Sequence, residues 1–246
     1  DICFLTFTPL VNNNICFDNI IVKRKCPNEC GVTPIQDFSC PCQSFNIDAR
    51  KPGAAVSNIS ALSSLPTITL FNEQFLVLDL TDCAAILGHL TVDRNLIIRA
   101  SATGSELKMQ PCSKITVKSG VSLEINFTNI HGCEKLWRDI FVEPGGNLTL
   151  RGNTISDAHH AVLVDPGPSA FHRQTKLNIT RNIFNRNHAG IFINGTPDAP
   201  PINHTIRGNT FTCTAPLFPE CDPEPYYLNT SGYIGIATAG VDLLLP

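Results

Sequence analysis

Two adjacent histidines, His159 and His160, follow Asp157 inside the apolar stretch "LTLRGNTISDAHHAVLV" at residues 148–164. Imidazole nitrogens bind metal ions and carry protons near neutral pH, and a neighbouring carboxylate can orient them. These residue types are therefore the first candidates in the chain for a catalytic or metal-binding site.

A later segment of the chain has the same pattern. Aligning "ISDAHHAVLV" with "FNRNHAGIFI" gives three pairs of opposite residues: His159 with His188, His160 with Ala189, and Asp157 with Arg186. Two stacked imidazoles can hold a metal ion, which makes His159 and His188 candidate ligands. Because no third ligand aligns with them in the repeat, we favour a polar aromatic stack that packs a corner, and we predict no metal and no other cofactor.

Carboxylates that could serve an enzyme are few. A polysaccharide hydrolase needs acids that converge on one face, and a lyase needs acidic calcium ligands and a base. The acids that we expect to face outward are Glu124, Asp139, Glu143, Asp157 and Asp165. Glu143 and Asp165 both follow a repeat valine and precede Pro-Gly, which indicates a recurring turn. We therefore expect no catalytic residues, with a polysaccharide-degrading enzyme as the competing hypothesis.

The elements that carry these residues form a repeat of about 25 residues. Val92, Val117 and Val142 recur at this interval, and "LEINFTNI", "LTLRGNTI", "LNITRNIF" and "HTIRGNTF" align without gaps. Their apolar residues alternate, which indicates strands with one buried face. Three short strands per repeat, joined by turns, predict an all-β chain folded as a parallel β-helix.

Asn153, Asn182 and Asn209 each lie two residues before the last apolar position of their segment. Stacked in one turn of successive repeats, their amides can hydrogen-bond along the axis, and asparagine tolerates the left-handed backbone of a tight turn. We therefore predict an asparagine ladder at these positions.

Eleven cysteines favour disulfides in an oxidising compartment over zinc, since the spacings Cys26-x3-Cys30 and Cys40-x-Cys42 are not those of paired zinc ligands. Cys213 and Cys221 flank the excursion "TAPLFPE" and are the best candidate pair. Cys112 is expected to pair with Cys133 or Cys83. The odd total leaves one thiol free or bonded to another chain.

Surface modification and sugar contact are two further candidate roles. Asn-x-Ser/Thr sequons predict glycans if the protein is secreted and eukaryotic, but they also arise by chance in a solenoid rich in Asn, Ser and Thr. They begin at Asn58, Asn126, Asn147, Asn178, Asn194, Asn203 and Asn229. Trp137 is interpreted as a corner-packing residue, with a sugar-stacking platform as the alternative.

The composition excludes several classes of protein. Of the 246 residues, 43% are hydrophobic and 16% are charged, which is typical of a folded domain. A formal net charge of −3 without a basic cluster argues against nucleic acid, and no apolar run is long enough to span a membrane. From the start at Asp1 and the apolar end "GIATAGVDLLLP" we expect a removed signal peptide or a longer parent protein.

Four segments are informative once the repeats are aligned: "CPCQSFNI", "MQPCSKITVKSGVSLEI", "IHGCEKLWRDIFVEPGGNLTL" and "ISDAHHAVLV". In these segments the chain resembles the right-handed (pectin-lyase-like) β-helix repeats of large secreted surface proteins of Bacteroidota. It implies fold and an extracellular location, and little enzymology. Asp139 departs from the family, which usually has glycine after Trp-Arg, and the Cys-rich start has no counterpart in it.

Two regions follow from these observations: a Cys-rich segment 1–45 and a β-helix over 46–246 that is expected to continue or be capped beyond this chain. The expected function is a non-catalytic structural or adhesive module of a large cell-surface protein or fibre. The alternatives are a polysaccharide lyase or hydrolase and a carbohydrate-binding module. Expected partners are further copies of the chain, to which the segment 1–45 adds strands or crosslinks, and carbohydrate or cell-surface ligands.

Overall fold

The computed structural model describes residues 22–23, 42, 45–50, 53–164, 175–194, 203–220 and 234–239. Most of the Cys-rich segment 1–45 lies outside these residues, as do Cys221, Asn229 and the side chain of Asn203. Within the described part of the chain, no helix has the length and apolar character of a membrane span.

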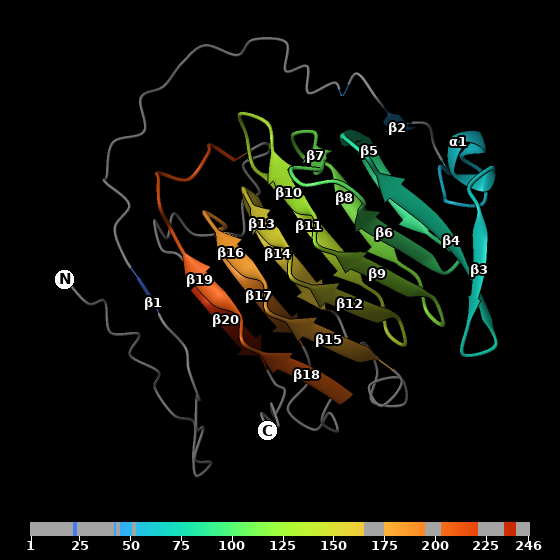
Figure 1. Cartoon of the computed structure of the whole chain (residues 1–246). Helices are drawn as coiled ribbons and strands as arrows, with labels where there is room; N and C mark the ends of the chain where they lie inside the picture. The colour runs from blue at the N-terminus through green and yellow to red at the C-terminus, as the bar shows by residue number, and fades with distance from the viewer. Residues whose placement is uncertain are drawn as a thin grey trace.

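Parallel strands stack along one axis in three sheets (Figure 1). The first sheet runs β1 (Val22–Lys23), β19 (Thr210–Thr212), β16 (Ile183–Asn185), β13 (Thr154–Ser156), β10 (Asn129–Gly132), β7 (Glu106–Met109) and β5 (Cys83–Val92), with β2 (Asn46–Ala49) also paired to β5. The second runs from the far half of β5 through β8 (Lys114–Val117), β11 (Trp137–Val142), β14 (Ala158–Val164), β17 (Ala189–Asn194) and β20 (Ile234–Ala239). The third runs β18 (Asn203–Arg207), β15 (Lys176–Thr180), β12 (Asn147–Arg151), β9 (Ser122–Asn126), β6 (Leu96–Ala100), β4 (Glu73–Leu80) and β3 (Thr67–Leu70), of which only β3 pairs antiparallel.

Each turn of the chain contributes one strand to each sheet, so that β9, β10 and β11 are followed directly above by β12, β13 and β14. Equivalent apolar side chains then stack inside: Leu148 pairs with Leu177, and Ile155 pairs with Phe184. The rings of Phe184 and Phe211 continue this column at 5.0 Å between centroids. The result is the predicted solenoid, a parallel β-helix with one continuous apolar core.

The turn between the third and first sheets is held by side-chain amides. Asn153 donates from its backbone N–H and its Nδ2 to Oδ1 of Asn182, at 2.9 and 3.0 Å, and Asn182 donates in the same way to Asn209. The Nδ2 of Asn182 also donates to the carbonyl of Leu150 at 3.0 Å. These three buried asparagines form a ladder along the axis.

The residue before each ladder position has a left-handed backbone. Its φ is +65° at Gly152, +57° at Arg181 and +65° at Gly208, and the equivalent residue of the preceding turn, Phe127, has a φ of +54°. At Gly152 a Cβ atom would also meet the ring of Phe127 at 2.7 Å, so glycine avoids both a close contact and the strain that Phe127 and Arg181 accept at the equivalent positions. The turn therefore repeats in backbone shape as well as in sequence.

Different elements lie at the two ends of the solenoid. At one end the helix α1 (Ser60–Ser63) lies beside β3 and β4 (Figure 1), and its Leu62 is fully buried in the core. At the other end Val22 pairs with Phe211, so β1 extends the first sheet beside β19. Apart from this short strand, Cys42 and Phe45, the segment 1–45 lies outside the described residues, so its addition of strands to a neighbouring subunit stays a prediction.

A disulfide joins Cys42, in the predicted Cys-rich segment, to Cys83 at the start of β5, with Cα atoms 5.8 Å apart. This bond excludes the alternative in which Cys112 pairs with Cys83. Cys112, Cys133 and Cys213 are also disulfide-bonded, but their pairing is not defined within the described residues. The pairs Cys213–Cys221 and Cys112–Cys133 therefore stay predictions.

Replacing Asn182 by alanine is expected to lower the free energy of unfolding by about 3 kcal/mol, because it leaves buried donors and acceptors of two neighbouring turns without partners. Urea denaturation measures the loss. The matched control is Asn178→Ala on the outward face of β15, which should cost less than about 0.5 kcal/mol. Equal losses in the two variants would show that the ladder does not stabilise the solenoid.

Removing the Cys42–Cys83 bond, whose cysteines are 41 residues apart, is expected to destabilise the protein by about 4 kcal/mol through the larger entropy of the unfolded chain. The double variant Cys42→Ser/Cys83→Ser, compared with the wild type by denaturation without reductant, measures it. An unchanged transition midpoint would contradict this expectation.

Candidate functional site

The histidines singled out by the sequence meet on one side of the solenoid. His159 lies on β14, and His188 directly precedes β17, where its backbone N–H donates to the carbonyl of Ala158 at 2.9 Å. This bond sets the two turns in register, and the imidazole centroids of His159 and His188 lie 4.8 Å apart with the rings tilted by 35°. The predicted stack of these two residues is present.

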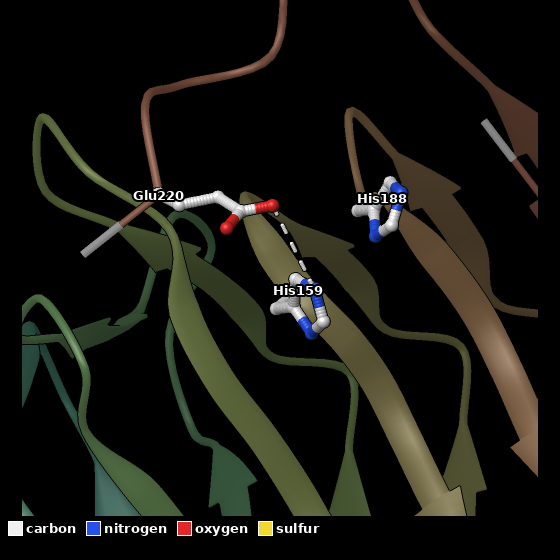
Figure 2. Close-up of side chains that lie close together, drawn as sticks. All are labelled: His159, His188 and Glu220. Atoms are coloured by element: carbon white, nitrogen blue, oxygen red, sulfur yellow. Dashed lines mark ion pairs between the residues drawn. The ribbon is translucent and has the colours of Figure 1, made fainter. Parts of the chain in front are cut away.

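A third potential ligand reaches them from outside the repeat. Oε1 of Glu220 lies 3.8 Å from Nε2 of His159, and one ligand atom from each of His159, His188 and Glu220 lies within 4.8 Å of the others (Figure 2). We call these three residues the His–His–Glu cluster. Glu220 lies outside the aligned repeats, so the alignment could not bring it together with the histidines. The absence of a metal stays a prediction.

The segment that carries Glu220 is held against the solenoid by its preceding residues. The carbonyl of Pro219 accepts a hydrogen bond from the backbone N–H of Leu136 at 3.0 Å. The ring of Phe218 lies under the guanidinium of Arg186, 4.9 Å from its centroid. Glu220 itself is 40% exposed, so its carboxylate is positioned by its neighbours and still able to move.

His160 supports His159 from the adjacent position on β14. Their Nδ1 atoms are 3.0 Å apart, so one donates a hydrogen bond and the other accepts it. His160 pairs in register with Ala189, as the alignment predicted. It is 5% exposed and also contacts the ring of Phe192, at 5.4 Å between centroids.

The electrostatics of this region keep both histidines neutral. Burial lowers the pKa of His159 to about 4, with contributions from His188 and Arg138. Burial also lowers the pKa of His160 to about 3, with contributions from His159 and His188. At ordinary pH their ring nitrogens can therefore accept hydrogen bonds or bind a cation.

Asp157 forms an ion pair with Arg186 at 2.9 Å, one turn further along the axis. Asp157 is 1% exposed, and burial raises the pKa of its carboxyl group while Arg186 opposes that rise. Both residues have a left-handed backbone, with φ of +64° and +54°. They are equivalent corner positions in successive turns rather than members of the His–His–Glu cluster.

Trp137 cannot serve as a sugar-stacking platform, which corrects one alternative from the sequence. Its side chain has 0% exposed surface and belongs to the core, and its Nε1 donates to the carbonyl of Ser156 at 2.8 Å. The indole packs inside the solenoid because β11 directs it inward at the corner.

The outward face of the second sheet carries an apolar stripe that the sequence analysis missed. Phe141, Leu163 and Phe192 are paired in register on β11, β14 and β17, and all three are partly exposed. The Nζ of Lys114 lies 4.0 Å from the centroid of the Phe141 ring. The register of "IFV", "VLV" and "IFI" in the aligned repeats was the signal that could have identified this stripe.

The sequons are spread over the surface. Asn58 and Asn194 are exposed, whereas Asn126, Asn147 and Asn178 are partly buried on outward positions of the third sheet. Nδ2 of Asn126 donates to Glu124 at 2.7 Å, and Nδ2 of Asn147 donates to Ser122 at 3.3 Å. Glycosylation at these positions stays a prediction.

Comparison with known proteins agrees with this architecture. The family model described as "Right handed beta helix region" matches residues 90–218, and the chain belongs to that family. The predicted right-handed parallel β-helix is thereby confirmed. No curated protein and no solved structure matches the chain.

Protonation of the buried histidines is expected to unfold the protein at acid pH. An unfolded histidine has a pKa of about 6.5, so the unfolded state binds protons first as the pH falls. The stability due to His159 and His160 is therefore complete above about pH 6.5 and is lost as the pH falls through their folded pKa values, about 4 and about 3.

Urea denaturation between pH 7.5 and 4.5 tests this expectation. The variant His160→Gln should lose less stability over this range than the wild type, and His131→Gln on β10 serves as the matched control. If His160→Gln and the wild type respond identically to pH, the histidine contribution is refuted.

Proposed function

We propose that the chain is a non-catalytic structural or adhesive module of a large extracellular surface protein, fibre or appendage. One observation carries the proposal: four acids on the described turns form ion pairs with cations of adjacent turns. These pairs are Asp79 with Arg99, Asp139 with Lys114, Glu143 with Lys118, and Asp157 with Arg186. The carboxylates thus link one turn to the next.

This arrangement argues against glycoside hydrolysis or elimination. A hydrolase needs two carboxyl groups that reach the sugar, one of them with a raised pKa. Burial raises the pKa of both Asp139 and Asp157, as in a catalytic acid, but they are only 5% and 1% exposed. Each is also engaged by a cation, so neither is available to a polysaccharide lying on the surface.

The disulfides support an oxidising, extracellular location. Cys42 is bonded to Cys83, and Cys112, Cys133 and Cys213 are bonded as well. Such bonds persist in secreted and cell-surface proteins and are rare in a reducing cytosol.

The sheet ends support self-association. β18 is the last strand of the third sheet, and β20 is the last strand of the second. Among the described residues each pairs on one side only, with β15 and β17 respectively. A strand edge of this kind is a template for a further strand, so we expect another copy or another domain to continue the solenoid there.

A second function, carbohydrate binding, is favoured by the apolar stripe. Phe141 and Phe192 lie two turns apart in register, a separation of about 9.6 Å from the usual strand spacing. Partly exposed aromatic side chains aligned on one sheet suit contact with the apolar faces of successive sugar rings. In this alternative the stripe, and not the buried Trp137, provides the surface that contacts sugar.

The proposed function predicts assembly without enzymatic activity. The intact protein, examined by light scattering and electron microscopy, should form oligomers or filaments. Incubation with acidic and neutral polysaccharides, with and without calcium, should release no oligosaccharides.

A strictly monomeric particle would contradict the assembly, and released oligosaccharides would replace the structural function by an enzymatic one. Polysaccharide binding that is lost in Phe192→Ser but kept in Leu90→Met, a conservative core control, would favour the carbohydrate-binding module instead.

A further inference from the structure

We propose that the His–His–Glu cluster binds a divalent transition-metal cation, with zinc as the best match, and that the bound ion fastens the segment after β19 to the solenoid. A structural or adhesive function does not require this site. It rests on the convergence of His159 on β14, His188 just before β17, and Glu220 in the segment after β19 (Figure 2).

The spacing of the ligand atoms is close to that of a tetrahedral zinc site. Zinc bonds of about 2.0–2.2 Å place the ligand atoms of a tetrahedron about 3.4 Å apart. Nε2 of His159 and Oε1 of Glu220 are 3.8 Å apart, and the ligand atoms of the whole cluster lie within 4.8 Å. Binding therefore requires the ligand atoms to approach one another by up to about 1.4 Å, and the exposed Glu220 side chain is the ligand with the most freedom to move.

His160 prepares His159 for this role. Histidine ligands usually hydrogen-bond through the ring nitrogen that does not bind the metal. When Nδ1–H of His159 donates to Nδ1 of His160, at 3.0 Å, the lone pair of His159 is left on Nε2. That nitrogen is the one that faces the Glu220 carboxylate. His160 is therefore a positioning residue and does not bind the ion itself.

The second histidine supplies an independent observation. Nδ1 of His188 is buried and has no hydrogen-bond partner among the described residues. A buried polar atom without a partner costs about 1–3 kcal/mol, and coordination of a cation at this nitrogen would remove that cost.

Charge and donor type narrow the choice of ion. Arg138 lies close enough to disfavour positive charge on His159, and the Glu220 carboxylate supplies the compensating charge at the same place. Two imidazoles and one carboxylate suit zinc and its neighbours in the transition series. Calcium and magnesium require mainly oxygen ligands, so this donor set selects against them.

Isothermal titration of zinc into the protein tests the site directly. The protein is prepared without a polyhistidine tag, stripped with a chelator and kept free of reductant so that its disulfides stay closed. We expect one equivalent of zinc to bind, and no heat from calcium. His159→Ala, His188→Ala and Glu220→Gln should each weaken zinc binding at least tenfold, and His160→Phe by about 10- to 100-fold.

The matched control is His131→Ala. His131 also lies near a carboxylate, 3.5 Å from Glu106, but it belongs to no potential metal-binding group among the described residues. It should bind zinc with wild-type affinity. Glu220→Gln changes an exposed side chain and leaves the core intact. This variant therefore still tests the zinc site if the histidine variants fail to fold.

Cobalt provides a second readout, because a tetrahedral site intensifies its visible absorption bands. The wild type should show these bands and Glu220→Gln should lose them. The inference is overturned if the wild type takes up no zinc, or if Glu220→Gln binds it as tightly as the wild type.

Discussion

The whole structure depends on in-register pairing between successive turns of the chain. A single turn cannot fully bury its own inward side chains, so Leu148 and Ile155 are covered by their equivalents in the neighbouring turns. Stability therefore belongs to the contacts between turns. The asparagine ladder, the ion pairs between turns and the histidine stack are consequences of this stacking.

Stacking places the side chains of equivalent positions side by side. The same register that aligns apolar residues inside the solenoid aligns polar ones outside it, which places Asp139 beside Lys114 and Asp157 near Arg186. Where two equivalent residues are both histidines, the repeat produces a pair of imidazoles about one strand spacing apart. A potential ligand set can thus arise from a structural repeat, and only one further residue is needed to complete it.

The elements outside the repeat decide how the ends and the candidate site are built. Residues before the solenoid contribute β1, which pairs with β19 near the opposite end, and Cys42, which is bonded to Cys83. The segment after β19 folds back so that Pro219 meets Leu136 and Glu220 approaches His159. Chain segments that the repeat does not constrain therefore carry what is particular to this protein within a widespread fold.

The sequence by itself determined the repeat, the parallel strands, the ladder at Asn153, Asn182 and Asn209, and the pairing of His159 with His188, because each follows from periodicity along the chain. Only the tertiary structure decided that Trp137 is buried and that Glu220 joins the histidines. The physical reason is that the neighbour of a repeat residue is the equivalent residue one repeat earlier or later, which can be identified from the sequence. The neighbours of Glu220 are set by how a non-repeating segment packs, and the direction of the Trp137 side chain depends on the local geometry of a corner.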